Sequence, residues 1–398
     1  MYCVTAFAIV ALSALGQDAS LATRSAELHA RREAKARELK PEQQGKAARF
    51  LLKIEDDLLL ERVLNPPRGI YLRVGGIGEG AGFGAGPGYR YSTGRFDFRV
   101  SAAGSLKGYA IGEASLILPG AVKDGPYFEV YARHRDFPQE DFFGIGPRTV
   151  PEERTNFALR DTLLRLSGGL RAGGFTAGVR GSYLDPRIGR GTDKRMPSTD
   201  AVFSPQEVPG LGEQPAFTVL EPFVEFSTTD PPLNPTSGSR LRLNFSQYSD
   251  RDLDRFSFRR WDVDARQYIP FFHKARTIAL RVLVSSAEPD SDHEVPFYLQ
   301  PILGGAYTLR GVRAFRFRDR SLALVQAEYR WRINEFVSGA LFYDTGAVAR
   351  RLSDLGKFER DYGFGLRAGG RNGVALRTDI VFGSGEGTRV LVRFDNVF

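Results

Sequence analysis

A period of two in hydropathy, sustained over long segments, most constrains what this chain can fold into. In residues 257–270, SFRRWDVDARQYIP, apolar Trp261, Val263 and Ile269 alternate with charged residues. Side chains on a β-strand point to opposite faces in turn, whereas a helix repeats every 3.6 residues. The same alternation occurs in residues 95–100, 240–245, 276–284, 321–333 and 389–398. The sequence therefore predicts an all-β fold with one apolar and one charged face.

The length of the alternating segments separates two kinds of β-protein. Strands of a soluble sandwich are usually about five or six residues long, whereas a tilted strand needs about 9–11 residues to cross a bilayer. Several segments here reach the longer class, with apolar side chains on one face and charged ones on the other. No run of about 18 apolar residues occurs, which excludes a transmembrane helix. We therefore favour a transmembrane antiparallel β-barrel over a soluble sandwich.

The spacing of turns predicts about 16 strands in residues 65–398, an even number as expected for a bacterial barrel. Long polar segments at 137–155, 185–215 and 286–320 alternate with short turns at 92–95, 168–174, 333–335 and 369–372. If the first strand leaves the periplasm, the long segments are external loops and the short ones are periplasmic turns.

The N-terminal region differs from the rest in composition. Residues 1–16 hold a short apolar stretch that ends in small residues, which indicates a secretory signal peptide, although no basic residue precedes it. Its removal would take away Cys3, the only cysteine. Residues 17–64 are rich in Ala, Glu, Arg and Leu and predict a short helical segment. We expect a periplasmic lead-in, either soluble or lying on the membrane surface as an amphipathic helix.

The sequence contains no specific catalytic or metal-binding pattern. No nucleophile elbow, phosphate-binding loop or paired metal-ligand spacing occurs, so we expect no enzyme, no metal and no cofactor. The four histidines are scattered, at positions 29, 134, 273 and 293. The net charge of +8 comes from arginines inside the predicted strands, which argues for a charged lumen rather than a nucleic-acid surface.

The long segment before residue 321 contains LGGAYTLRGVRAF at 303–315, followed by LVQAEYRWRI at 324–333 and LFYDTGAV at 341–348. This order of motifs, with a terminal Phe, resembles the BamA/TamA-type outer-membrane assembly-factor superfamily, also called the bacterial surface-antigen family. The resemblance covers about residues 69–398 and is best after Gly304. It implies a location in the bacterial outer membrane with the N-terminus in the periplasm.

The resemblance also implies a set of site residues. In the family the sixth external loop folds into the lumen, and its arginine contacts acidic residues on the two strands that follow. By that correspondence the loop latch comprises Arg310, Gly311, Glu328 and Asp344, supported by Gly304, Gly305, Phe342 and Gly346. The alternation independently places Glu328 and Asp344 on the inward face. A bidentate pair with arginine, shielded from water, is stronger than an exposed pair.

The sequence departs from the family pattern in two places, which limits how much of the family's structure and activity can be expected of this chain. An aromatic residue usually follows the Arg-Gly pair, but Val312 stands here, so Phe315 or Phe317 has to supply that contact. Assembly factors of the family usually carry POTRA repeats before the barrel, and residues 17–64 are too short for one. The chain therefore resembles the POTRA-less branch.

In the family, the first and last strands form a weak seam that opens sideways and templates a client strand by β-augmentation. Glycines in both regions fit such a seam, or else relieve curvature: Gly75, Gly76, Gly78 and Gly385. At the C-terminus, Val390, Val392, Phe394 and Phe398 fall on one face. Phe394 and Phe398 resemble the C-terminal signal that the cell's barrel-assembly machinery reads, which would make this chain its client.

Two function classes follow. The first is a barrel that aids insertion or translocation of client outer-membrane or secreted proteins through a lateral gate. The second is a passive pore or lipid conduit that the long external loop plugs. Both place outer-membrane lipid against the barrel, and neither involves nucleic acid. An enzyme ranks third, and an unchanged phenotype after substitution of His134 and His273 would count against it.

Overall fold

The structure is a computed structural model and describes residues 66, 68–119, 124–230, 234–272, 274–334, 336–370, 373–383, 385–394 and 398. The predicted signal peptide at 1–16 and helical segment at 17–64 lie outside the described residues. Within the described part, no helix has both the length and the hydropathy needed to cross a membrane.

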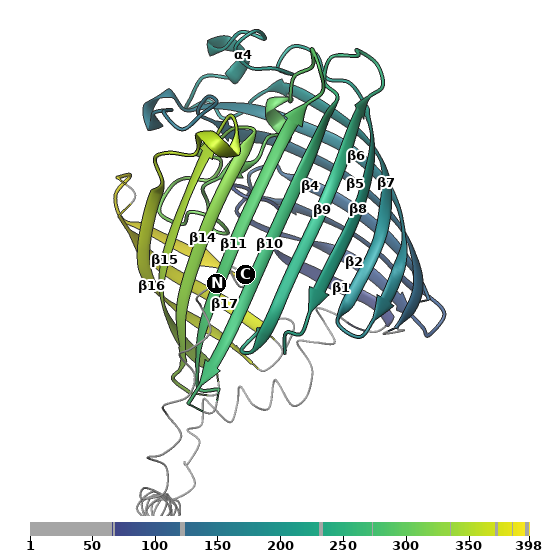
Figure 1. The fold of residues 1–398 in the computed structure, drawn as a ribbon, viewed down its shortest axis with the longest axis vertical. Coiled ribbons are helices and arrows are strands. Elements are labelled where there is room, and N and C mark those ends of the chain that lie inside the picture. The colour runs from purple at the N-terminus through teal and green to yellow at the C-terminus, as the bar shows by residue number, and fades with distance from the viewer. Residues whose placement is uncertain are drawn as a thin grey trace, which may run out of the picture. The chain divides into compact units, whose positions relative to one another are not determined.

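Sixteen antiparallel strands form one sheet that follows chain order and curls into a barrel (Figure 1). The strands are β1 (Arg68–Gly76), β2 (Phe83–Ser92), β3 (Asp97–Ser105), β4 (Ala110–Leu118), β5 (Gly125–Phe142), β6 (Thr155–Ala172), β7 (Phe175–Arg190), β8 (Phe217–Ser227), β9 (Gly238–Asp250), β10 (Phe258–Phe271), β11 (Arg276–Pro289), β14 (Ser321–Arg332), β15 (Val337–Ala349), β16 (Glu359–Gly370), β17 (Gly373–Phe382) and β18 (Arg389–Arg393). A separate two-stranded ribbon pairs β12 (Ile302–Leu303) with β13 (Phe317–Arg318). The predicted fold class and strand number are confirmed.

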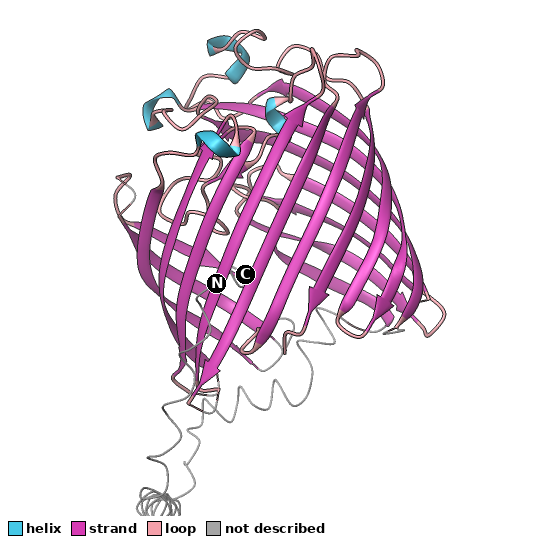
Figure 2. Cartoon of the chain, in the orientation of Figure 1, coloured by secondary structure: helices cyan, strands magenta, loops and turns pink. Residues whose placement is uncertain are grey.

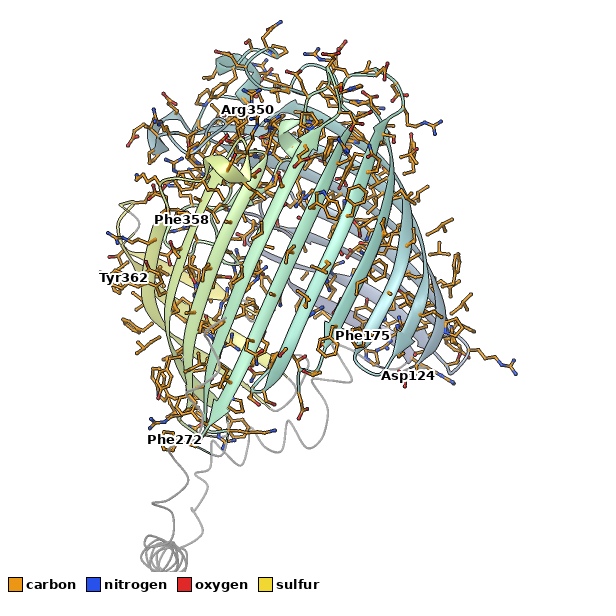
Figure 3. All side chains as sticks on the ribbon, in the orientation of Figure 1. Asp124, Phe175, Phe272, Arg350, Phe358 and Tyr362 are labelled. Atoms are coloured by element: carbon orange, nitrogen blue, oxygen red, sulfur yellow. The ribbon has the colours of Figure 1, made fainter. Side chains whose placement is uncertain are left out.

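Alternation of the side chains sets which face of the sheet is apolar. On β10 and β11, Trp261, Ile269 and Val282 are exposed on the outer face. Asp264 and Arg281, on the inner face of the same strands, form an ion pair. An exposed apolar exterior around a charged interior is the arrangement that a barrel needs in a bilayer. Outward side chains cover the barrel wall in Figure 3, where Phe175 and Phe272 mark the end with the short turns.

Connections at the two ends of the barrel differ as predicted. The long ones are 143–154, 191–216 and 290–320, and they lie at one end, here called the loop end. The short helices α4 (Thr199–Val202), η1 (Pro151–Glu153), η2 (Phe297–Leu299) and η3 (Leu352–Asp354) also lie at the loop end, as Figure 2 shows. The opposite end, here called the turn end, has short connections such as 173–174 between β6 and β7.

Strand boundaries differ from expectation on one side of the barrel. β5 runs to Phe142, β6 begins at Thr155 and β7 runs to Arg190, so parts of two segments predicted as loops are paired strand. Gly168 and Gly169, predicted in a turn, lie inside β6. At the loop end of β5, β6 and β7 the apolar outer face is lost, because a strand segment beyond the bilayer does not need one. Strand pairing at this end can be supported by polar contacts such as that of Arg160 with Asp136, whose atoms Nη2 and Oδ2 are 2.7 Å apart.

Candidate functional site: the loop latch and the strand seam

The 290–320 loop enters the lumen through a narrow ribbon. β12 and β13 bring its two arms together, and residues 304–316 form the tip between them. Gly304 and Gly305 have φ of +119° and +104°, which side chains other than glycine rarely adopt. A Cβ on Gly304 would lie 2.4 Å from the carbonyl oxygen of Arg313. Both glycines are therefore required by the backbone of the tip.

Arg310 is fully buried at the end of this loop and contacts both acids expected from the sequence. Its Nη1 donates to Oε1 of Glu328 at 2.6 Å, while Nε and Nη2 donate to Asp344 at 2.6 and 2.8 Å. The guanidinium also stacks 3.5 Å from the centre of the Phe342 ring. Burial opposes the charged form, but Asp344 and Glu328 outweigh it and raise the pKa of Arg310. The arginine is thus held as a permanent cation.

Two further acids take part that the sequence reasoning did not single out. Oδ2 of Asp361 on β16 accepts the backbone N–H of Gly311 at 2.8 Å. Oδ2 of Asp379 on β17 lies 3.7 Å from Nη1 of Arg310. Their positions on the inward face follow from the same alternation, which was the available signal. The loop tip is therefore held by β14, β15, β16 and β17.

Arginines on the strands balance the charge of these acids. Nε of Arg330 lies 2.7 Å from Oε2 of Glu328, and Nη1 of Arg367 lies 2.6 Å from Oδ1 of Asp379. Ion pairs removed from water are stable only when each charge is compensated and hydrogen-bonded. Removal of Arg310 would leave Asp344 and its neighbours with excess negative charge in the lumen.

Apolar side chains pack beside the latch and account for the departure at Val312. Val312 is buried in a cluster with Phe317, Leu303 and other residues of β14 and β15. Phe317 is thus the aromatic residue in the cluster of Val312, whereas Phe315 is outside this cluster. Gly346 makes room for the loop, since a Cβ there would lie 3.1 Å from Cδ1 of Leu303.

Two more arginines of the loop contact other parts of the barrel, and neither was expected from the sequence. Nε of Arg316 lies 2.8 Å from Oε1 of Glu386, in the connection between β17 and β18. Its Nη2 donates to the carbonyl oxygen of Thr149, in the connection between β5 and β6, at 2.5 Å. Arg318 lies among the rings of Phe142, Phe157 and Phe297, and burial lowers its pKa to about 10.

The first and last strands form no ladder with each other in the described part of the chain, where the sheet begins at β1 and ends at β18. β18 has only five residues. Across this seam, Nη2 of Arg393 lies 2.9 Å from Oε2 of Glu79, and the rings of Phe83 and Phe394 are 5.4 Å apart. Side chains where β1 turns into β2 therefore contact side chains at the end of β18, where no backbone pairing occurs among the described residues.

The predicted seam glycines fall in three different places. Gly75 and Gly76 lie on β1, and a Cβ on Gly76 would lie 3.4 Å from Nη1 of Arg393. Gly78 lies beyond β1, where a Cβ would lie 2.9 Å from the Phe137 ring, so it makes room for β5 instead. Gly385 lies between β17 and β18, with φ of +77°.

The two C-terminal phenylalanines lie on different sides of the wall. Phe394 is exposed on the outer face, as expected. The prediction that Phe398 shares this face is wrong, because Phe398 is buried in the lumen with Tyr268 and Ala279. Nη2 of Arg330 donates to the backbone oxygen of Phe398 at 3.3 Å. Phe398 departs from the outer face because these lumen contacts hold it.

No group of three or more potential metal ligands occurs among the described residues. Of the histidines, Nδ1 of His134 lies 2.9 Å from Oγ1 of Thr162, and Nδ1 of His293 lies 2.7 Å from the carbonyl oxygen of Ser291. His29 and His273 lie outside the described residues. The geometry of the site serves to hold a loop and two strand edges.

Comparisons with known proteins bear on the fold of the barrel. The barrel is similar to the crystal structure of BamA from Haemophilus ducreyi lacking POTRA domains 1-3, with TM-score 0.60 and 13% identity, covering 82% of this chain and 70% of that one. CdiB from Escherichia coli matches with TM-score 0.49 and 14% identity, over 80% of this chain and 58% of that one. No curated protein sequence matches the chain significantly. Residues 218–383 match the profile of the Omp85 superfamily domain. The resemblance to the BamA/TamA-type superfamily is thus confirmed: residues 218–383 match the Omp85 superfamily domain, and the sixteen-stranded barrel has the fold of that BamA structure.

Proposed function

We propose that this chain is an outer-membrane barrel that aids insertion or translocation of proteins by opening between β1 and β18. The observation that carries the proposal is the seam, where two strand edges face each other without a ladder in the described residues. An edge strand presents unpaired N–H and C=O groups that can pair with a strand of another chain. Under this proposal, a client protein would pair one of its strands with that edge.

The contacts around Glu79 support a connection between the seam and the loop latch. Glu79 binds Arg393 of β18, and its carboxylate also receives a backbone hydrogen bond from Ala306 in the loop tip. A Cβ on Gly305 would lie 2.9 Å from Oε2 of Glu79. One carboxylate thus contacts the tip of the loop and the last strand, from the connection that follows β1. Seam opening would break the link to Arg393.

A covalent cross-link across the seam tests the proposal. In a Cys3→Ser background, Phe83→Cys and Phe394→Cys replace two rings that touch, so a short bifunctional maleimide can bridge them. The matched control is Phe175→Cys with Phe226→Cys. These rings are 4.5 Å apart on strands β7 and β8, which are already paired.

Both proteins are reconstituted in vesicles and supplied with a urea-unfolded outer-membrane barrel as client. We expect the seam cross-link to abolish client folding, scored by protease protection, while the control cross-link leaves it unchanged. Full activity of the seam-linked protein would contradict the proposal. The alternative, a passive pore plugged by the loop, predicts that deletion of 304–319 raises conductance whether or not the seam is cross-linked.

We further propose that the chain is itself inserted by the cell's barrel-assembly machinery, which would read its C-terminal residues, and that it lies with its N-terminus in the periplasm. Exposed Val390, Val392 and Phe394 supply the outward apolar face of such a signal. Since Phe398 is buried in the lumen, reading of that residue would have to precede the final fold.

A further inference from the structure

Away from the latch, several clusters on the lumen wall contain more arginines than carboxylates. A recurring arrangement is one inward carboxylate held by two guanidinium groups, which leaves a surplus positive charge each time. It occurs at Asp161 with Arg133 and Arg135, at Glu225 with Arg240 and Arg242, and at Asp264 with Arg266 and Arg281. The surplus faces the interior of the barrel, where wall charges of one sign raise the local concentration of the opposite ion.

A cavity of about 160 Å³ lies against this wall, between strands β5 to β9 and residues Tyr298 and Leu299 of the external loop. Three arginines and two carboxylates line it. Asp161 is shared by two of the arginines, and Glu221 is bound by Arg180, which is outside the lining. The space suffices for a small oxyanion with water around it.

Arg165 is the third arginine of this cavity, and its contacts set it apart. Its Nε donates to Oγ of Ser182 at 3.2 Å. Among the described residues, no carboxylate lies within ion-pair distance of the Arg165 guanidinium. Arg133 and Arg135, in contrast, both form ion pairs with Asp161. A half-buried cation without a counter-charge is electrostatically unfavourable, and an anion in the cavity would compensate it.

Two further donors that line the cavity lack an acceptor in the described part of the chain. They are Nε of Arg133 and the hydroxyl of Tyr298, both buried. Burial raises the pKa of Tyr298, so this hydroxyl stays protonated and remains a donor. Buried donors in folded proteins nearly always have an acceptor, which an oxyanion supplies through several oxygens at once.

We propose that this cavity is a binding site for a small oxyanion, a carboxylate or a phosphate group, with Arg165 as its main ligand. Nε of Arg133 and the hydroxyl of Tyr298, which are closed off from solvent in this structure, would turn toward the anion to donate the remaining hydrogen bonds. The site is independent of seam opening, since it lies on β5 to β9 and is capped by the loop. The oxyanion site and the proposed function can therefore be tested independently.

The test measures thermal unfolding of the full-length barrel in detergent, by heat-modifiable gel mobility, while phosphate replaces chloride at constant ionic strength. A ligand that binds only the folded state raises the unfolding midpoint as its concentration increases. We expect such a rise for the unaltered protein, and at least a ten-fold weaker apparent affinity for Arg165→Gln. Arg171→Gln is the matched control. Arg171 lies on β6 at the same inward register, stacked on Tyr127 and outside the cavity lining.

Equal responses of Arg165→Gln and of the unaltered protein would overturn the proposal, as would a midpoint that responds to neither phosphate nor acetate. If Arg165→Gln does not fold, Tyr298→Phe and Arg165→Lys decide, with weaker phosphate affinity expected for both and unchanged affinity counting against the site. A second titration uses acetate. A response to acetate equal to that of phosphate identifies carboxylates as ligands, and a response to phosphate alone identifies phosphate groups.

Discussion

At the scale of single residues, the latch depends on the shape of the arginine side chain as much as on its charge. Arg310 uses Nε and Nη2 on the two oxygens of Asp344 and Nη1 on Glu328, so three N–H directions of one planar group are used. A lysine ammonium is a compact point charge and cannot reproduce this fork. The flat face of the guanidinium also stacks on Phe342, which an ammonium group cannot do in the same way.

Arg310→Ala should release the loop and destabilise the barrel by about 3–5 kcal/mol, because it leaves buried carboxylates uncompensated. Arg310→Lys should recover only part of this loss. Urea unfolding gives the free energy, and limited proteolysis within 290–320 gives loop release. Arg313→Ala is the control, as its side chain is half exposed and should cost little. Loop protection unchanged in Arg310→Ala would contradict the latch.

Gly304 allows a second prediction from local geometry. Gly304→Ala should destabilise the loop by at least about 1–3 kcal/mol, since its φ is positive and its Cβ would meet the Arg313 carbonyl oxygen. Gly385→Ala also has positive φ, but a Cβ there has open space, so its effect should be smaller. Proteolysis rates of the two variants, compared under the same conditions, test this difference. Equal rates would mean that crowding at the tip is unimportant.

The residues of the latch are predictable from sequence to different degrees. Arg310, Glu328 and Asp344 can be identified because motif order and alternation point to the same residues. Asp361 and Asp379 fall on the inward face by the same alternation, but no motif marks them, and their contacts depend on how far the loop descends. Alternation predicts the wrong face for Phe398 because periodicity describes a regular strand, and β18 ends at Arg393.

At the scale of elements, the connection that follows β1 contacts β18 through side chains, and Glu79 forms the ion pair with Arg393. Burial raises the pKa of Glu79 despite the nearby charge of Arg393. Because its pKa is raised in the folded state, Glu79 favours folding most at low pH, and this contribution is lost as pH rises through the folded value. The ion pair with Arg393 needs the charged form, so it weakens on acidification at a higher pH than an ordinary glutamate would require.

Glu79→Gln should therefore loosen the seam without unfolding the barrel. The rate of maleimide cross-linking between the two cysteines introduced by Phe83→Cys and Phe394→Cys reports how close the two edges lie. We expect this rate to fall in Glu79→Gln, and to fall in the parent as pH decreases toward the usual range for a glutamate, after correction for maleimide reactivity. Glu152→Gln in η1 is the control. An unchanged rate in Glu79→Gln would show that the ion pair does not hold the edges together.

Strand boundaries were the least predictable part of the elements. Membrane-spanning parts of β10, β11 and β14 are identified from alternation because lipid selects apolar side chains on one face. At the loop end of β5, β6 and β7 the apolar side chains face inward instead, where Phe142 and Phe157 pack against Phe297 of the 290–320 loop, so their burial depends on a segment distant in sequence. Local pattern cannot supply that information.

At the scale of the whole molecule, a sheet of sixteen hydrogen-bonded strands is expected to dominate stability, with the latch adding to it. Unheated protein in SDS should therefore migrate as a compact species and shift on boiling. Arg310→Lys should still show this shift, but at a lower temperature. Loss of the compact species in unheated Arg310→Lys would mean that the latch, and not the strand ladder, maintains the barrel.

The sequence separation of the contacts has a consequence for the order of folding. Arg316 and Thr149 are 167 residues apart, and Arg393 and Glu79 are 314 apart. Closing chain segments of that length costs entropy before any contact compensates it, so contacts of this kind form late. Docking of the loop would then mark the completion of folding, and a protease pulse during refolding should cut the 290–320 loop until the last strand is in place.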